Sequence, residues 1–177
     1  MATEKEKALV VLKQGMSTEL WGQRFYEQAA KRTKAEDGRK VFESLVAEEQ
    51  KHLDILRGQY ASISGKGTWI SVADAMAMAA SVDPAGIFPK AASAERLVPK
   101  DATDLQALQM AMDFERRGYE LYAAEAKRAA SPEAKAMWEL LAKAEDAHYT
   151  FLQETRDYLQ TNGTWYFDAK EFPFFEG

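Results

Sequence analysis

The chain has 177 residues, the usual length of one domain, and a net charge of −5 at pH 7. Acidic and basic residues are interspersed, with no basic block that could neutralise phosphates, so we expect neither nucleic acid nor membrane as a partner. The absence of cysteine excludes disulfides, thiolate nucleophiles, iron–sulfur clusters and cysteine-bound zinc. Any metal in this chain must be held by oxygen and imidazole nitrogen.

The N-terminal sequence and the apolar runs indicate the cellular location of the protein. The first seven residues lack the apolar stretch of a secretory signal. The longest run of low charge, 70–82, contains Asp74 and many alanines, so it is a poor membrane span. We therefore expect a single cytoplasmic domain covering residues 1–177.

Four long segments show helical periodicity with capping signals at their ends. The first helix is predicted over 4–34, where Thr3 and Glu6 have the spacing of a capping box. The second is predicted over 37–63, because the glycine-rich stretch 64–67 marks its end. These two helices form the first half of the chain.

The second half repeats this organisation. A third helix is predicted to follow Thr103 and to reach about residue 130, with a glutamine at its capping-box position. Ser131 and Pro132 then provide an N-cap and a first-turn proline for a fourth helix, which ends at Asn162 and Gly163.

The connections between these helices predict the topology. Short links within each half make antiparallel hairpins, whereas 64–102, with a short helix predicted over 71–80, is long enough to cross the bundle. We predict an all-α fold: a ferritin-like four-helix bundle of two helical hairpins, with a long crossover between helices 2 and 3. The aromatic tail 164–177 is expected to pack on the bundle or on a partner subunit.

The two halves share a repeated pattern. The chain has two histidines, and each follows a glutamate by three residues, in Glu49 to His52 and in Glu145 to His148. An offset of 96 residues superimposes these motifs and five further pairs: Glu19 with Glu115, Gly22 with Gly118, Tyr26 with Tyr122, Leu45 with Leu141, and Leu56 with Leu152. This pattern indicates a duplicated hairpin, in which two half-sites meet about a pseudo-two-fold axis.

Helical spacing places the repeated acids on apolar faces. The predicted buried face of the first helix is Leu9, Leu12, Met16, Glu19, Gln23, Tyr26 and Ala30. The predicted face of the third is Leu105, Leu108, Met112, Glu115, Tyr119, Tyr122 and Ala126. The second and fourth present Leu45, Glu49, His52 and Leu56, and Leu141, Glu145, His148 and Leu152. None of these faces contains a lysine or arginine.

Burial of four unpaired carboxylates is too costly without a counterion. Each costs several kcal/mol, and the whole net stability of a domain is only about 5–15 kcal/mol. Two divalent cations would balance the four charges, and oxygen-rich coordination with one imidazole per metal suits iron or manganese. The predicted metal ligands are Glu19, Glu49, His52, Glu115, Glu145 and His148. Other acids nearby are predicted to lie on solvated or flanking faces: Glu27, Glu48, Asp113, Glu120, Glu125 and Asp146.

A glutamate from each of two helices, with Glu-x-x-His from each of the other two, resembles the ferritin-like di-iron carboxylate pattern. Within that superfamily the four helices are most similar to rubrerythrins. The resemblance implies two iron ions, with manganese or a mixed pair as alternatives, and Glu49 and Glu145 as bridging or chelating ligands. Tyr26 and Tyr122, each seven residues after a ligand glutamate, are predicted to orient carboxylates through hydrogen bonds.

The resemblance also implies a function. We expect an oxidoreductase that acts on peroxide or O2, with iron(II) oxidation as a further reaction, and a homodimer. Rubrerythrins with a second, cysteine-bound iron domain deliver electrons internally, whereas this chain has no cysteine and needs an external electron donor. It also has Met112 where the family carries an additional glutamate. The alternatives are a non-catalytic iron-binding or storage bundle, and a helical interaction module without a metal.

Overall fold

The computed structural model describes residues 3–81 and 98–173. Within these ranges the regular secondary structure is entirely helical, as predicted. The helices are α1 (Glu4–Arg32), α2 (Glu36–Lys66), α3 (Val72–Met78), α5 (Asp104–Arg128) and α6 (Pro132–Asn162), and a 3-10 turn, η1 (Ala79–Ser81), follows α3.

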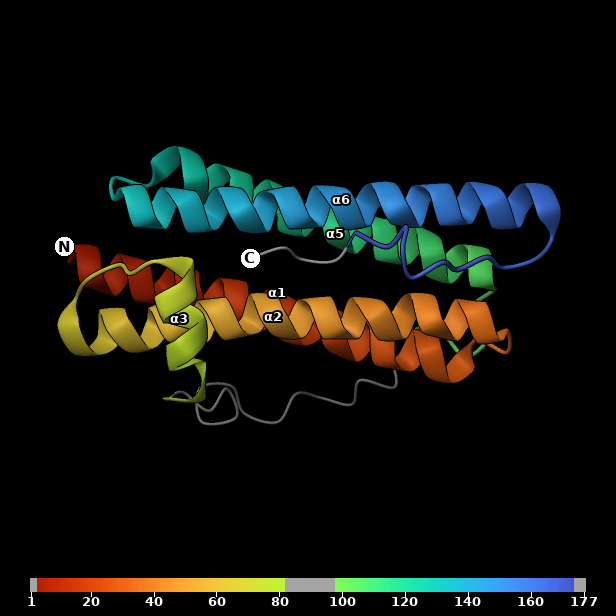
Figure 1. Cartoon of the computed structure of the whole chain (residues 1–177), viewed down its shortest axis with the longest axis horizontal. Helices are drawn as coiled ribbons and strands as arrows, with labels where there is room; N and C mark the ends of the chain where they lie inside the picture. The colour runs from red at the N-terminus through yellow and green to blue at the C-terminus, as the bar shows by residue number, and fades with distance from the viewer. Residues whose placement is uncertain (1–2, 82–97, 174–177) are drawn as a thin grey trace.

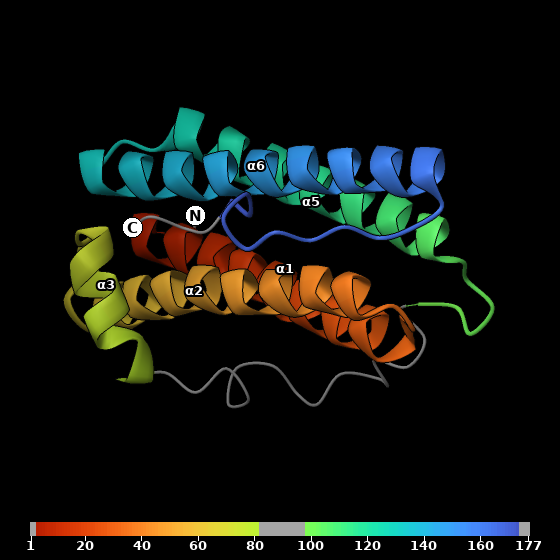
Figure 2. The same cartoon turned by 45° about the vertical axis from the view of Figure 1, so that its right-hand side comes forward.

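The four long helices form two antiparallel hairpins that pack against each other. Figure 1 shows α1 and α2 as one layer and α5 and α6 as the other. Helix α5 begins at the opposite end of the bundle from the end of α2, so these two helices run parallel (Figure 2). This is the topology of a ferritin-like bundle. Part of the predicted crossover, 82–97, lies outside the described residues.

The helix boundaries follow the capping residues. Thr3 and Thr103 both make the predicted capping boxes, and the Ser131 side chain accepts from the backbone of the first turn of α6. The predicted end of the second helix is wrong, because α2 continues to Lys66. The chain leaves the helix only at Gly67, which has a φ of 72° that favours glycine.

The apolar core is divided into two clusters, one toward each end of the bundle. Leu12, Met16, Leu56 and Met137 belong to the cluster at the end where α1 begins. The cluster toward the other end consists of Phe25, Tyr26, Ala29, Ala30, Val41, Phe42, Leu45, Val98, Ala107, Leu108, Ala111, Met112, Leu152 and Phe172. Six buried glutamates and histidines, contributed by all four long helices, lie between the two clusters.

One part of the predicted apolar faces is wrong. Leu105 is 37% exposed and Tyr119 is 42% exposed on α5. The buried face instead uses Ala107 and Gly118. The residue that follows Glu115 on the buried face is therefore Gly118, three positions later, because glycine leaves room for the Glu145 side chain of α6.

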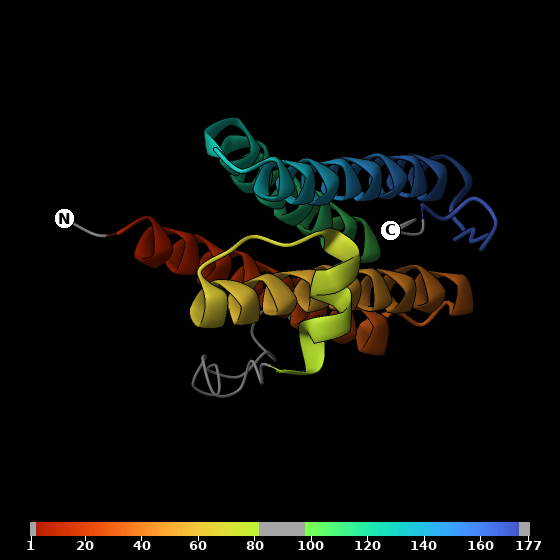
Figure 3. The same cartoon turned by 60° about the vertical axis from the view of Figure 1, so that its left-hand side comes forward.

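Helix α3 crosses the end of α2 at close range, as Figures 1 and 3 show. A Cβ atom at Gly58 would lie only 1.8 Å from the carbonyl oxygen of Ala75, so this crossing requires glycine. The link before α3 is also held in place. The amide of Gln59 pairs with the backbone of Ile70 at 2.6 and 3.2 Å, and the Ser62 hydroxyl donates to the Thr68 carbonyl at 2.8 Å.

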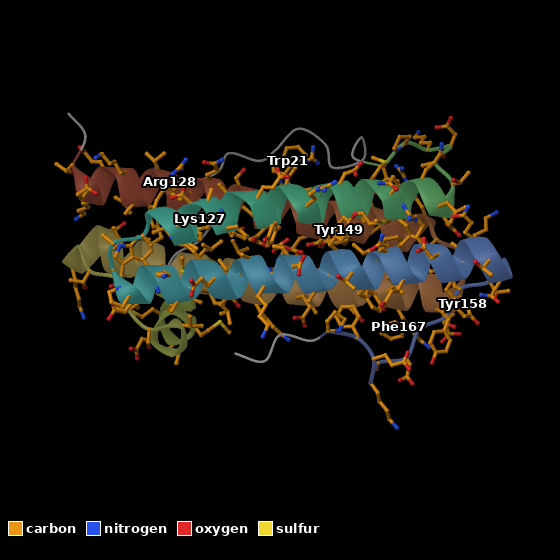
Figure 4. The ribbon with its side chains drawn as sticks, turned by 90° about the horizontal axis from the view of Figure 1, so that it is seen from above. Trp21, Lys127, Arg128, Tyr149, Tyr158 and Phe167 are labelled. Atoms are coloured by element: carbon orange, nitrogen blue, oxygen red, sulfur yellow. The ribbon has the colours of Figure 1, made fainter. Side chains whose placement is uncertain are left out.

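The described part of the C-terminal tail runs back along the bundle. Trp165 Nε1 donates to Asp104 Oδ2 at 2.9 Å. Phe172 is buried against Phe151, with ring centroids 4.7 Å apart. Phe167 marks the course of this segment in Figure 4.

No helix in the described part of the chain is long and apolar enough to cross a membrane.

Candidate metal centre

Six ionisable side chains from the four long helices meet between the two apolar clusters. Each is at most 1% exposed. Their ligand atoms form two groups, and within each group the atoms lie within 4.8 Å of one another. The groups are Glu19, Glu49, His52 and Glu145, and Glu49, Glu115, Glu145 and His148. The structure therefore brings together all six residues predicted from the sequence, and Glu49 and Glu145 belong to both groups.

The histidines link the two hairpins. His52 Nδ1 on α2 lies 3.1 Å from Glu145 Oε1 on α6 and 3.4 Å from Glu19 Oε2 on α1. His148 Nδ1 lies 3.5 Å from Glu115 Oε2 and 3.9 Å from Glu49 Oε1. The two imidazole rings are nearly parallel, at 19°, with centroids 5.5 Å apart. Each histidine thus faces carboxylates of both hairpins.

Two helical glycines make room for the shared carboxylates. A Cβ atom at Gly118 would lie 2.8 Å from Glu145 Oε2. At the equivalent position, a Cβ atom at Gly22 would lie 3.2 Å from Glu49 Cδ and 2.9 Å from a ring carbon of Phe114. The glycine pair of the repeat therefore lets α2 and α6 place their carboxylates against the backbones of α1 and α5.

Both predicted tyrosines make hydrogen bonds to carboxylates, and they do so across the hairpins. The Tyr26 hydroxyl on α1 donates to Glu115 Oε1 on α5. The Tyr122 hydroxyl on α5 donates to Glu19 Oε1 on α1. Burial, followed by the nearby carboxylates, raises the pKa of both tyrosines well above its usual value, so both stay protonated donors. Each tyrosine leaves the second oxygen of its glutamate free to face the cluster.

With all four carboxyl groups ionised, the cluster has too few hydrogen-bond donors to satisfy every carboxylate oxygen. Buried atoms without a donor or acceptor include Glu19 Oε2, both oxygens of Glu49, Glu115 Oε2, Glu145 Oε1 and both ring nitrogens of His148. Buried polar atoms without partners are costly, and such a concentration of them in one place fits a site for bound cations. Two divalent cations would supply the partners and balance the charge.

The pKa shifts show how the carboxyl groups compete for protons. Burial, and then repulsion from neighbouring carboxylates, raises the pKa of Glu49 and Glu145 well above the usual value. Burial alone would also raise the pKa of Glu19 and Glu115, but hydrogen bonds and the histidines outweigh it and lower both. Without a metal, the two shared carboxyls therefore bind protons more readily than Glu19 and Glu115 do.

One acid that was predicted to lie on a solvated or flanking face is buried. Glu48 is fully buried, and its Oε1 lies 2.7 Å from the ammonium of Lys51. The lysine three residues later is the sequence signal that could have indicated this pairing. Of the other acids predicted to be solvated or flanking, Glu125 is half-buried and paired with Arg128 at 2.7 Å.

Comparisons with known proteins agree with this geometry. The Rubrerythrin family model matches residues 11–156. The chain belongs to the rubrerythrin family. Among solved structures, a hypothetical protein from Pyrococcus furiosus is similar in fold, with a TM-score of 0.66 and 22% sequence identity over 90% of this chain and 93% of that one. No curated protein matches the chain.

Proposed function

We propose that this rubrerythrin-family protein binds two iron ions and uses them to reduce peroxide or O2. The observation that carries the proposal is the overlap of the two ligand groups at Glu49 and Glu145. Two carboxylates shared by two groups, with one imidazole in each, is the arrangement of a carboxylate-bridged pair of metals. Manganese, or one ion of each metal, would fit the same donors.

Each side chain has a separate part in the proposed centre. Glu19 and His52 would complete the ligands of one ion, and Glu115 and His148 those of the other. Glu49 and Glu145 would bridge the two ions. Bound iron would supply Lewis acidity and electrons at this position. The two apolar clusters flank this set of donors on either side.

The reaction of peroxide needs two electrons and two protons, and it yields two molecules of water. We propose that the electrons come from an external donor. Met112, buried at the position where the family carries an additional glutamate, offers no carboxylate, so the six residues named above form the whole proposed ligand set. A homodimer is proposed on the basis of the family alone.

Metal analysis and turnover test this proposal together. Protein purified without chelators should contain about two metal ions per chain by mass spectrometry, and anaerobic iron(II) loading followed by air should produce the near-ultraviolet band of oxo-bridged iron. With a reductant present, the loaded protein should consume peroxide over many turnovers. Metal uptake without turnover would instead support a storage or sequestration role. An absence of uptake would contradict both.

A further inference from the structure

A row of aromatic side chains runs from the metal centre toward one end of the bundle. Tyr122, hydrogen-bonded to Glu19, stacks on Trp138 with ring centroids 5.6 Å apart and planes at 22°. Trp138 meets Trp69 edge to face at 6.3 Å and 69°. These separations are those of rings in direct contact. The row therefore connects a metal-ligand carboxylate to the link between α2 and α3 without a gap.

The outer end of this row reaches solvent. Tyr122 and Trp138 are buried, whereas Trp69 is only half-buried. Both tryptophans line a surface cavity of about 550 Å³ at the end of the bundle where α1 begins and α5 ends. Arg128, labelled in Figure 4, lies on the rim of the same cavity. A small solute can therefore approach Trp69 without entering the metal centre.

The position of Trp69 is fixed by its neighbours. The Gln59 amide holds Ile70 on one side, and the Ser62 hydroxyl holds Thr68 on the other. Gln59 and Ser62 are both buried on α2. The indole is thus held against Trp138 by two anchored neighbours and does not depend on its own packing alone.

A second row of three rings begins at Tyr26 and has the same geometry, with one substitution. Tyr26 stacks on Phe42 at 6.2 Å and 24°, and Phe42 meets Trp165 at 5.8 Å and 69°. The offset of 96 residues pairs Phe42 with Trp138. The ring geometry is therefore preserved, but phenylalanine resists oxidants that remove an electron from tyrosine or tryptophan. This row is interrupted at its middle ring.

We propose that Tyr122, Trp138 and Trp69 form a one-electron relay between the metal centre and the surface. The oxidant is the metal centre after peroxide has oxidised it, so this part of the proposal rests on the proposed function. Tyr122 loses one electron to that centre and passes its hydroxyl proton to Glu19 Oε1. Trp138 then reduces the tyrosyl radical in a reversible step in which the proton returns from Glu19, and the supply of electrons from the surface draws this step forward. Trp69 reduces the Trp138 cation radical.

An external one-electron reductant at the cavity finally reduces the Trp69 cation radical. One electron has then moved from the surface to the centre, and the relay residues recover their original protonation. With no reductant present, the same row moves oxidising equivalents away from the ligands to the surface. The equivalent row through Phe42 cannot do either.

The relay can be tested on the metal-free full-length protein by pulse radiolysis. Azide radicals oxidise tryptophan in one-electron steps, and the tryptophan and tyrosine radicals are followed by their separate optical absorption. The wild type should convert tryptophan radical into tyrosine radical in a first-order phase whose rate is independent of protein concentration. This phase is the reverse of the step in which Trp138 reduces the Tyr122 radical, and it needs the same ring contact. Because no metal or peroxide is present, this result stands or falls separately from the proposed function.

Three variants make the test specific. Trp138→Phe, which places in the second hairpin the residue that the first one has, should lose the phase. Phe42→Trp should add a second phase by joining Trp165 to Tyr26. Trp21→Phe, at a residue 36% exposed at the outer edge of the bundle in Figure 4, should leave the rate of the phase unchanged. Conversion in Trp138→Phe equal to that of the wild type would overturn the relay.

Discussion

The two hairpins are nearly equivalent where they face the metal centre and differ where they face away from it. Each contributes a tyrosine, a helical glycine, two glutamates and a histidine at positions related by the same offset. Outside this layer, α2 is crossed by α3 at Gly58, whereas α6 is covered by the tail, whose Phe172 ring lies 6.4 Å from that of His148. The repeated residues are therefore those that face the candidate metal centre, and the two halves differ on their outer faces.

The largest expected difference is between a shared and an unshared glutamate. Glu145→Ala should lose both ions, because Glu145 belongs to both ligand groups. Glu115→Ala should keep the ion beside His52, because Glu115 belongs to one group alone. Mass spectrometry of metal content per chain measures this. Equal losses in the two variants would show that the carboxylates do not bridge.

The glycine pair should show a smaller difference. Gly118→Ala brings a methyl group to 2.8 Å from Glu145 Oε2, so we expect metal-loaded stability to fall by about 1–3 kcal/mol together with weaker metal binding. In Gly22→Ala the nearest atom is a ring carbon of Phe114, so metal binding should fall less. Thermal unfolding with and without metal separates these effects.

Gly65→Ala is the matched control for the glycine variants. This residue lies inside α2, and a Cβ atom there would meet nothing within 4 Å. The change should therefore stabilise the protein by up to about 1 kcal/mol with no effect on metal. A similar gain from Gly118→Ala would contradict the close packing against Glu145.

The tyrosines should have crossed effects on the two ions. Tyr26→Phe removes the donor to Glu115 and should weaken the ion beside His148. Tyr122→Phe removes the donor to Glu19 and should weaken the ion beside His52. Loss of a hydrogen bond that orients a ligand typically costs about 10–100-fold in metal affinity. Competition with a chelator measures both, and weakening of the ion on the tyrosine's own hairpin would contradict the crossed pairing.

The smallest expected effect is on pH dependence. The raised pKa of Glu49 and Glu145 means that the folded metal-free protein holds more protons than the unfolded chain once the pH exceeds the ordinary glutamate value of about 4.3. Its stability should therefore fall as pH rises from there toward the raised values. Metal binding should remove this slope and release protons, which calorimetry in buffers of different ionisation enthalpy detects. A metal-free melting temperature that rises over this interval would contradict the assignment.

Repetition explains why much of the centre was predictable. A single Glu-x-x-His is common on solvated helices, but two in register with Glu19 and Glu115 placed six residues on four facing helices. The hydrogen bond from Tyr26 on α1 to Glu115 on α5 was not predictable. Helical spacing shows which residues share a face of one helix, but not how a neighbouring helix is rotated against that face. Burial of Glu48 was missed for a similar reason.

Helix starts could be predicted from the sequence, whereas one helix end and one exposed face could not. Capping residues located the starts of α1, α5 and α6 because their hydrogen bonds are local. The end of α2 was placed too early, because Gly65 is tolerated inside the helix and only Gly67, with its positive φ, ends it. The exposure of Tyr119 could not be predicted, because it depends on which side of α5 faces α6, and contacts between the two helices set that orientation.

Anomalous X-ray diffraction from crystals of the iron-loaded protein would test the two-metal centre most directly. We predict two anomalous peaks about 3.5–4 Å apart, one beside His52 and one beside His148, with Glu49 and Glu145 between them. A single peak, or none within reach of these side chains, would contradict the centre and leave the duplicated hairpin as architecture without the metal chemistry proposed for it.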